Sequence, residues 1–257
     1  MSRFFKTAWH ALAGCIMTGL TMASDSIAAD TAEKSVAVSI VSIPKEEIFV
    51  DYVYDPEAGE LRDRLGRQPS RSAPGIERVA DSGGLPALRP SAKQPVQLTG
   101  LDLPAGPLTL TLWIRPDSGS SNAPQTIRSS NVLAIGIDKT GHYQVTRNDD
   151  NRRPQTATAT TPLVPDRWQH LAATHDGATL SLCLDGKLIA STPCRGRKTS
   201  YSDSIEVLGS QSGGRNPFRG LIASYTVYNR PLTSAEITTL ARTPPVAHWA
   251  GGGGGWA

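Results

Sequence analysis

The stretch Leu108-Thr-Leu-Thr-Leu-Trp113 decides the fold class, because its leucines alternate with other residues at every second position. Successive side chains of a β-strand point to opposite faces. The three leucines therefore share one face, while Thr109, Thr111 and Trp113 share the other. This period of two predicts a half-buried strand rather than a helix.

A second stretch, Trp168-Gln-His-Leu-Ala-Ala-Thr-His-Asp176, has the same period. Alternation places Trp168, His170 and Ala172 on one face and Leu171 with Ala173 on the other. We therefore expect His170 to be a strand histidine that holds a neighbouring loop, not a catalyst.

Turn and cap signals surround these two strands. Asp176-Gly177 and Asp185-Gly186 supply the residues that tight hairpin turns need. Thr233-Ser-Ala-Glu236 is a capping box, and Pro244 stops the helix that it predicts. Further strands are expected at 131–137, 142–147, 178–184, 187–191, 204–208 and 221–228. This spacing predicts an all-β, antiparallel two-sheet β-sandwich of the jelly-roll type, with one short C-terminal helix.

The motifs also occur in a characteristic order. Leu108 to Pro116 is followed by the double strand from Trp168 to Ala190 and by the run Val227-Tyr-Asn-Arg-Pro-Leu232. Over residues 48–242 this series resembles the LamG-like jelly-roll domains of the concanavalin A-like lectin/glucanase family. The resemblance implies the sandwich, but it leaves function open because the fold hosts lectins, adhesion modules, glycosidases and lyases.

The resemblance also raises the question of calcium. Many relatives hold this ion with carboxylates near the opening and closing segments, which implies Asp55 and Asp63 as candidate ligands. The closing segment has Ala223-Ser224 where relatives often carry an acidic pair. We therefore expect no required cofactor and leave calcium as an option. The alternative role of Asp63 is to cap the backbone of its own turn.

The two ends of the chain differ from the middle. Residues 1–29 have a basic start, an apolar stretch and small residues, as in a secretory signal peptide. Residues 30–47 form a lead-in segment, and 243–257 form a flexible Gly-rich tail. We expect a secreted, periplasmic or cell-envelope protein without a membrane span. Leu12-Ala-Gly-Cys15 resembles a lipobox, so a lipid anchor at Cys15 is the alternative.

Cys183 and Cys194 remain once the signal peptide is removed, and an oxidising compartment permits a disulfide. The Asp185-Gly186 turn pairs Cys183 with Leu188, and the continued register sets Cys194 opposite Gly177. The two cysteines would then lie about 20 Å apart, although a bond needs Cα atoms within about 7 Å. A bond forms only if the chain leaves the ladder after about residue 190, so both states stay open.

The sequence offers little chemistry for catalysis. The net charge is only +3, and no basic run with interleaved aromatics points to nucleic acid. No strand carries the paired carboxylates of a retaining glycosidase, and histidines and cysteines lack zinc spacing. Glu206 is a lone strand carboxylate that we expect on a solvated face. The sequence therefore predicts a non-enzyme.

Two polar loops are the candidate binding elements, because loops on a rigid sandwich carry function. Their candidate ligand-binding residues, with one neighbouring aromatic, are Tyr143, Asn148, Asp149, Asp150, Asn151, Arg152, Arg215 and Asn216. Amide and guanidinium groups beside an aromatic face suit sugar hydroxyls. The predicted function is an exported module that binds carbohydrate or extracellular matrix and envelope glycans. The alternatives are a protein-binding adhesive or structural cell-envelope domain and a divergent glycoside hydrolase.

Overall fold

Strand β7 (Leu108–Pro116) lies at the centre of a ten-stranded antiparallel sheet in a computed structural model of the chain. The structure describes residues 42–72, 77–79, 85–93, 95–101, 103, 106–119, 122–130, 132–196 and 206–245. All of them belong to one unit, Ile40–Ala257. The expected signal peptide, Cys15, the lead-in up to residue 41 and the tail beyond residue 245 lie outside the described residues.

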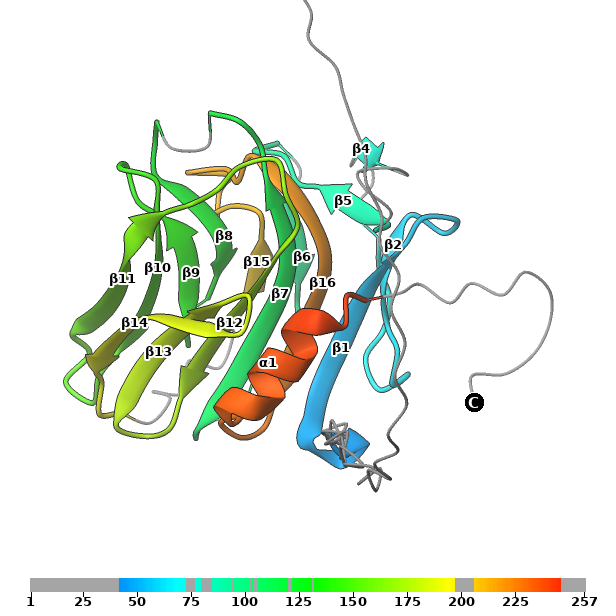
Figure 1. The fold of residues 1–257 in the computed structure, drawn as a ribbon. Helices are drawn as coiled ribbons and strands as arrows, with labels where there is room; N and C mark the ends of the chain where they lie inside the picture. The colour runs from blue at the N-terminus through cyan, green and yellow to red at the C-terminus, as the bar shows by residue number, and fades with distance from the viewer. Residues whose placement is uncertain are drawn as a thin grey trace, which may run out of the picture. The chain divides into compact units, whose positions relative to one another are not determined.

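The larger sheet has the strand order β14-β13-β12-β7-β16-β1-β2-β3, and the β4–β5 pair joins it through β16 (Figure 1). Its other strands are β1 (Ile48–Asp55), β2 (Glu60–Asp63), β3 (Arg71–Ser72), β4 (Glu77–Val79), β5 (Ala87–Arg89), β12 (Gln169–His175), β13 (Thr179–Leu184), β14 (Lys187–Pro193) and β16 (Gly220–Tyr228). A short 3-10 helix (Lys45–Glu47) precedes β1.

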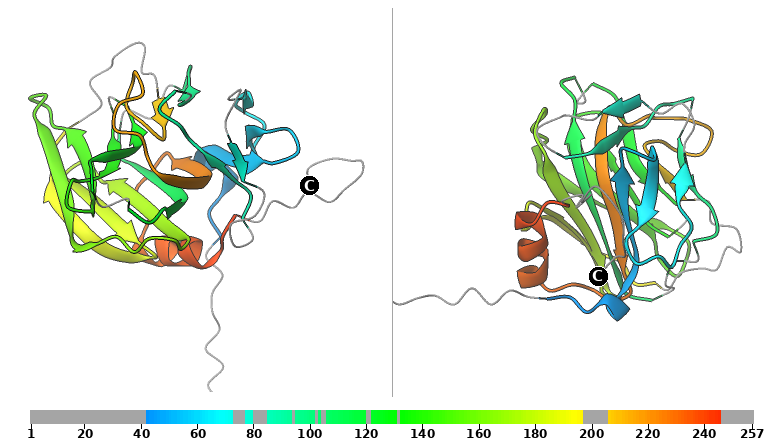
Figure 2. Two further views of the ribbon diagram at one scale, coloured as in Figure 1. Left: turned by 90° about the horizontal axis from the view of Figure 1, so that it is seen from above. Right: turned by 90° about the vertical axis from the view of Figure 1, so that its right-hand side faces the viewer.

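The smaller sheet has six strands in the order β11-β10-β9-β8-β15-β6, and it packs on the first as a second layer (Figure 2). Its strands are β6 (Val96–Leu98), β8 (Gln125–Ser129), β9 (Ala134–Ile137), β10 (His142–Asn148), β11 (Pro154–Pro162) and β15 (Glu206–Leu208). The predicted antiparallel two-sheet sandwich with one short helix is confirmed.

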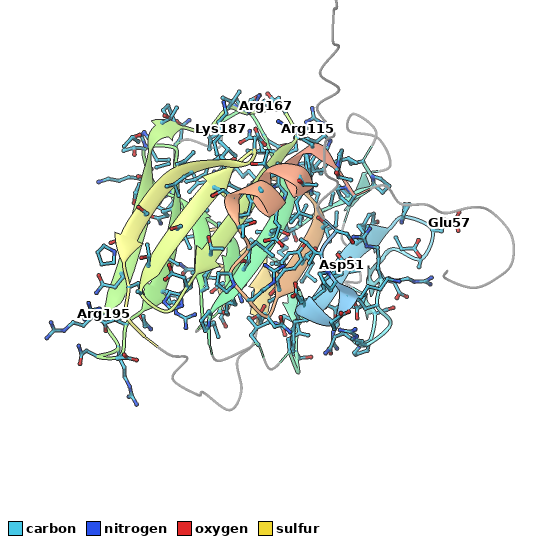
Figure 3. The ribbon with its side chains drawn as sticks, turned by 60° about the horizontal axis from the view of Figure 1, so that its bottom comes forward. Asp51, Glu57, Arg115, Arg167, Lys187 and Arg195 are labelled. Atoms are coloured by element: carbon cyan, nitrogen blue, oxygen red, sulfur yellow. The ribbon has the colours of Figure 1, made fainter. Side chains whose placement is uncertain are left out.

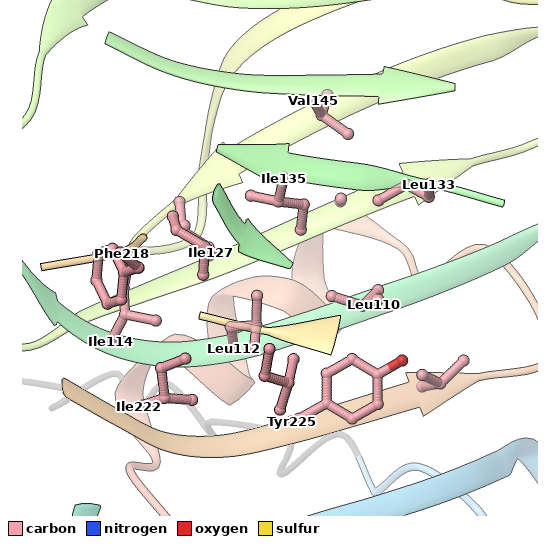
Figure 4. Close-up of a cluster of buried hydrophobic side chains, with 14 of the residues drawn as sticks. Leu110, Leu112, Ile114, Ile127, Leu133, Ile135, Val145, Phe218, Ile222 and Tyr225 are labelled. Atoms are coloured by element: carbon pink, nitrogen blue, oxygen red, sulfur yellow. The ribbon is translucent and has the colours of Figure 1, made fainter. Parts of the chain in front are cut away.

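The apolar interior takes one face of each sheet. The leucines of β7 are fully buried there, together with Ile127, Ile135 and Val145 of the smaller sheet (Figure 4). β7 pairs with β12 on one side and β16 on the other, so three long strands share the interior. Burying an aliphatic side chain of this size contributes about 1.5–3 kcal/mol. The alternation in the sequence thus locates the core correctly.

Helix α1 (Ser234–Arg242) covers part of the opposite face of the larger sheet. The Thr233 side chain accepts a hydrogen bond from the Glu236 amide, and the Glu236 side chain accepts one from the Thr233 amide, which is the predicted capping box. Ile237 then packs with Ala172 and Tyr228 of the sheet. No helix in the described part of the chain is long and apolar enough to cross a bilayer.

The two cysteines are free and buried on opposite faces of the larger sheet. Cys183 lies opposite Leu188 as expected, but a bulge between Leu182 and Cys183 shifts the remaining register by one residue. The Cys194 amide therefore donates to the carbonyl of Ala178. Cys183 packs in the cluster under α1, whereas Cys194 belongs to the interior. The sheet itself separates the two thiols.

Glu206 contradicts the prediction of a solvated face. It is fully buried between the sheets, where Arg128 Nη2 donates to its Oε1 at 2.5 Å. The Tyr225 hydroxyl, from the other sheet, donates to Oε2. Leu98 and Leu208 are interior residues, and the register of β15 against β6 sends Glu206 to the same side. A charge on one short strand cannot reveal a partner that is 78 residues away in the sequence.

Breaking this pair will destabilise the protein strongly. Glu206→Gln leaves the buried guanidinium of Arg128 without its counter-charge, and we expect the free energy of unfolding to fall by about 3–5 kcal/mol. Urea denaturation followed by circular dichroism measures the change. Arg167→Gln, which removes the exposed ion pair with Asp185, is the control and costs less than about 1 kcal/mol.

The double variant Arg128→Met with Glu206→Gln should lose less stability than the sum of its single variants, because each single change strands the other partner. Additive losses, or a Glu206→Gln variant as stable as the parent, would show that the two groups do not interact.

Candidate functional site

The outer face of strands β10 and β11 carries mostly hydroxyl and amide side chains. In β10, Tyr143 and Val145 point into the interior, so Gln144, Thr146 and Asn148 point outward. In β11, two interior alanines alternate with exposed threonines. We call this set the polar face; its members are Gln144, Thr146, Asn148, Thr156, Thr158 and Thr160.

The register lines these groups up across the strands. Gln144 lies opposite Thr158, and Thr146 lies opposite Thr156, with their hydroxyl oxygens 2.8 Å apart. On the other side, Gln144 faces Gly136 of β9, which has no side chain. Hydroxyl and amide groups both donate and accept hydrogen bonds. The polar face can therefore meet a ligand that is rich in hydroxyl groups.

No carboxylate stands on this face among the described residues of β9, β10 and β11. A glycosidase of the retaining type needs two carboxyl groups about 5 Å apart. Gln144 and the surrounding threonines cannot supply a general acid or a nucleophile of that kind. The hydroxyl and amide groups of the polar face can form neutral hydrogen bonds.

Tyr143 was expected as an aromatic ligand-binding residue, and the structure contradicts this. Its side chain is fully buried between the sheets, and its hydroxyl donates to Gln169 Oε1 at 2.8 Å. Burial raises the pKa of the phenol far above its ordinary value. The reason is parity: Tyr143 is two residues from Val145, so both point inward while Gln144 points outward.

The loop after β10 borders one end of the polar face. The Asp149 carboxylate accepts hydrogen bonds from the amides of Asn151 (2.9 Å) and Arg153 (2.8 Å). These backbone donors lower its pKa. Asp149 therefore holds the turn, which also places Arg152 at a φ of 60°. Asp150, Asn151 and Arg152 remain exposed, next to the end of the polar face.

The second predicted loop lies at the opposite end of the same sheet. The Asn216 carbonyl accepts from the Thr126 amide at the start of β8, and the Arg215 carbonyl accepts from Gln211. The first loop instead neighbours the start of β9, because Thr146 faces Ala134. The side chains of Arg215 and Asn216 are exposed. The structure does not bring the two loops together into one site.

Asp55 and Asp63, the candidate calcium ligands, lie at opposite ends of the β1–β2 hairpin. Asp63 accepts four backbone N–H groups, from Asp51, Leu65, Arg67 and Gln68. Asp55 accepts the amides of Glu57 and Ala58 and pairs with Arg62 at 3.1 Å. Within the described residues, no three His, Cys, Asp or Glu side chains are placed to hold a metal ion. These two carboxylates cap the turns on either side of β2.

Sequence reasoning missed a second surface, on the outer face of the ten-stranded sheet. Trp113 and Trp168 are partly exposed there, and the ring of Trp113 lies 5.5 Å from that of His170, tilted by 53°. The alternation had already placed both tryptophans on the face opposite the leucines, and that was the available signal. His170 lies against the Trp113 ring, and its backbone amide donates a hydrogen bond to Asp185 of the following turn.

Burial also sets the protonation of His170, whose pKa is lowered to about 4. An unfolded histidine titrates near 6.5, so the unfolded chain binds more protons between these values. The free energy of unfolding therefore carries no penalty from His170 above about pH 6.5. It falls by roughly 3 kcal/mol as the pH falls toward 4. Urea midpoints measured from pH 7 to 4 test this.

His170→Gln should remove that part of the acid dependence, and the contribution of His175, whose pKa burial also lowers, remains. Equal slopes for the parent and His170→Gln would contradict the assignment.

The fold is shared with several solved structures. The binding domain of Paraclostridial Mosquitocidal Protein 1 superposes with a TM-score of 0.59 at 13% identity, over 77% of this chain and 52% of that one. Domain 4 of AbnA, an extracellular arabinanase from Geobacillus stearothermophilus solved with arabinotriose, gives 0.62 at 17%, over 76% and 98%. The binding domain of botulinum neurotoxin DC, solved with SialylT, gives 0.60 at 14%, over 77% and 51%. At these identities the likeness shows the fold alone.

The sequence itself matches one curated protein and one family. Pappalysin-1 of Mus musculus is 26% identical over 161 residues, which cover 54% of this chain and 10% of that protein. The matched stretch thus spans about a tenth of that relative. The Laminin_G_3 model, described as the concanavalin A-like lectin/glucanases superfamily, matches residues 90–238. Because this match spans more than half of the sequence, the chain belongs to the Laminin_G_3 family.

Proposed function

We propose that the protein is an exported, non-catalytic module that binds a neutral glycan on the polar face. The observation that carries this proposal is the register of Gln144 and Thr146 against Thr158 and Thr156, which presents hydroxyl and amide groups in neighbouring rows. Sugar hydroxyls both donate and accept hydrogen bonds, and the hydroxyl and amide side chains of the polar face can do the same. The exposed Asn151 and Arg152 add further hydrogen-bonding groups at one end.

Two structural neighbours support the choice of ligand class. Domain 4 of AbnA was solved with arabinotriose, and the neurotoxin binding domain was solved with SialylT. Both share the fold of this chain, although their identities of 17% and 14% transfer no residue. A sandwich of this kind is therefore a workable scaffold for sugar recognition, and the outward side chains of each protein choose the ligand.

A binding role suits the polar face better than hydrolysis does. Glu206, which the sequence offered as a strand carboxylate, is held between Arg128 and Tyr225 in the interior. It is therefore withdrawn from any surface substrate. The lack of carboxylates along the described β9, β10 and β11 points in the same direction.

Export follows from the signal-peptide pattern of residues 1–29. We place the mature protein in the periplasm, in the cell envelope or outside the cell, where polysaccharides are the abundant hydroxyl-rich ligands. An adhesive or structural domain that recognises protein is the competing function, and the experiment below separates the two.

A neutral-glycan array probed with the mature protein tests the proposal. The double variant Thr156→Val with Thr158→Val keeps the β-branched shape but removes two hydroxyls, and we expect it to bind at least ten-fold more weakly, which is about 1.4 kcal/mol. Thr156→Ser with Thr158→Ser keeps the hydroxyls and should retain binding. Ser191→Ala, on the other sheet, is the remote control.

Two outcomes would overturn the proposal. If the parent protein binds no neutral glycan on the array, the competing function, recognition of a protein, replaces the proposed one. A valine variant that binds like the parent removes the polar face from the site. The array is repeated in EDTA, and we expect equal binding because backbone N–H groups already occupy the oxygens of Asp55 and Asp63.

A further inference from the structure

Two partly exposed tryptophans lie on the outer face of the ten-stranded sheet, away from the polar face. The register of β7 against β12 pairs Trp113 with His170, and its continuation by one residue sets Trp168 opposite Arg115. Both indoles pack against one small buried cluster, whose members are Leu85, Ala87, Leu221 and Ala223. The two rings therefore share one apolar base.

The Trp113 ring is also supported from the side of β12. The ring of His170, which is fully buried, lies 5.5 Å from it and is tilted by 53°. An indole that is packed on one side and still partly exposed offers a rigid aromatic surface to a ligand. Two such rings over one base can contact successive units of a chain-like ligand.

One cation and one anion border the indoles without a partner of opposite charge. Arg115 shares the outward face of β7 with Trp113, and it makes no ion pair or side-chain hydrogen bond with the described residues. The Asp166 amide donates to the carbonyl of Pro116, and the exposed Asp166 carboxylate accepts from Ser118. A guanidinium only donates hydrogen bonds, whereas a carboxylate only accepts them. The border therefore offers both functions to a ligand.

The other charges at this border are paired with one another. Arg89 of β5 pairs with Asp117 just after β7. Arg167 pairs with Asp185, which accepts from its Nη2 at 2.7 Å. Together with the unpaired cation and the unpaired anion, these pairs give the border no net charge. Charge complementarity therefore selects an uncharged ligand whose polar groups both donate and accept hydrogen bonds.

We call Trp113, Arg115, Asp166 and Trp168 the Trp surface, and we propose that it is a second site, which binds a neutral chain of β-linked glucopyranose units. The ring substituents of such a unit are equatorial, so both ring faces present only C–H bonds, which pack on indoles. The hydroxyls at the ring edge accept hydrogen bonds from Arg115 and donate them to Asp166. A pyranose thus combines the flat apolar face and the neutral polar edge that this surface requires. The site is separate from the polar face.

Fluorescence titration of the mature protein with cellotetraose, a short chain of β-linked glucose units, tests the proposal. The parent should bind it with a change in tryptophan emission, because the ligand covers two indoles. Trp168→Ala should weaken binding at least ten-fold. The affinity of the parent should stay constant as salt is raised, because the ligand carries no charge for salt to screen.

Further variants make the result specific. Arg115→Gln leaves the apolar base intact and should weaken binding at least three-fold. Arg195→Gln removes the same charge at the opposite edge of the molecule (Figure 3) and should leave binding unchanged. Thr156→Val with Thr158→Val should also leave it unchanged, which separates this site from the proposed function. Circular dichroism checks that each variant is folded.

The proposal fails if the parent does not bind cellotetraose, or if Trp168→Ala and Arg115→Gln both bind it like the parent. It also fails if the Thr156–Thr158 variant loses cellotetraose, because the ligand then binds on the polar face. A parent that binds other neutral glycans through Thr156 and Thr158, but not cellotetraose, keeps the proposed function and loses this second site.

Discussion

One apolar interior shared by two sheets constrains the long strands of this protein. β7, β12 and β16 give one face each to that interior, and β8, β9 and β10 close it from the other side. Since successive side chains alternate, each strand has only one further face to use. Packing into the interior therefore determines which side chains remain outside and can contact a ligand. Tyr143 is buried in the interior, for example, whereas its neighbour Gln144 points outward.

The remaining faces of the two sheets differ in chemistry. The outer face of the smaller sheet carries hydroxyl and amide groups and stays open along β10 and β11. The outer face of the larger sheet is covered by α1 over Ala172 and Cys183, and apolar residues of β5 contact it near Leu221. Trp113 and Trp168 lie on this outer face between α1 and the apolar residues of β5. Two layers with one core can thus present two unlike surfaces.

The sequence predicted the fold because long alternating strands such as β7 and β12 show their buried face directly. It missed β8, which has a single aliphatic residue, Ile127, and β11, whose inward side chains are only alanines. Both strands exist because their neighbours supply the burial and the hydrogen bonds, a tertiary effect that local pattern does not carry. Tyr143 was misplaced for a related reason, since the polar loop beside it suggested an exposed ring.

The buried ion pair shows the same limit most clearly. Glu206 is the first residue of the short strand β15. So short a strand does not show from its sequence whether Glu206 points to solvent or to the interior. Arg128 and Tyr225 decide the matter, and they come from β8 and β16, in different sheets. A pair of this kind adds little net stability, yet it penalises any packing that separates its members. It therefore ties the register of β15 to both layers.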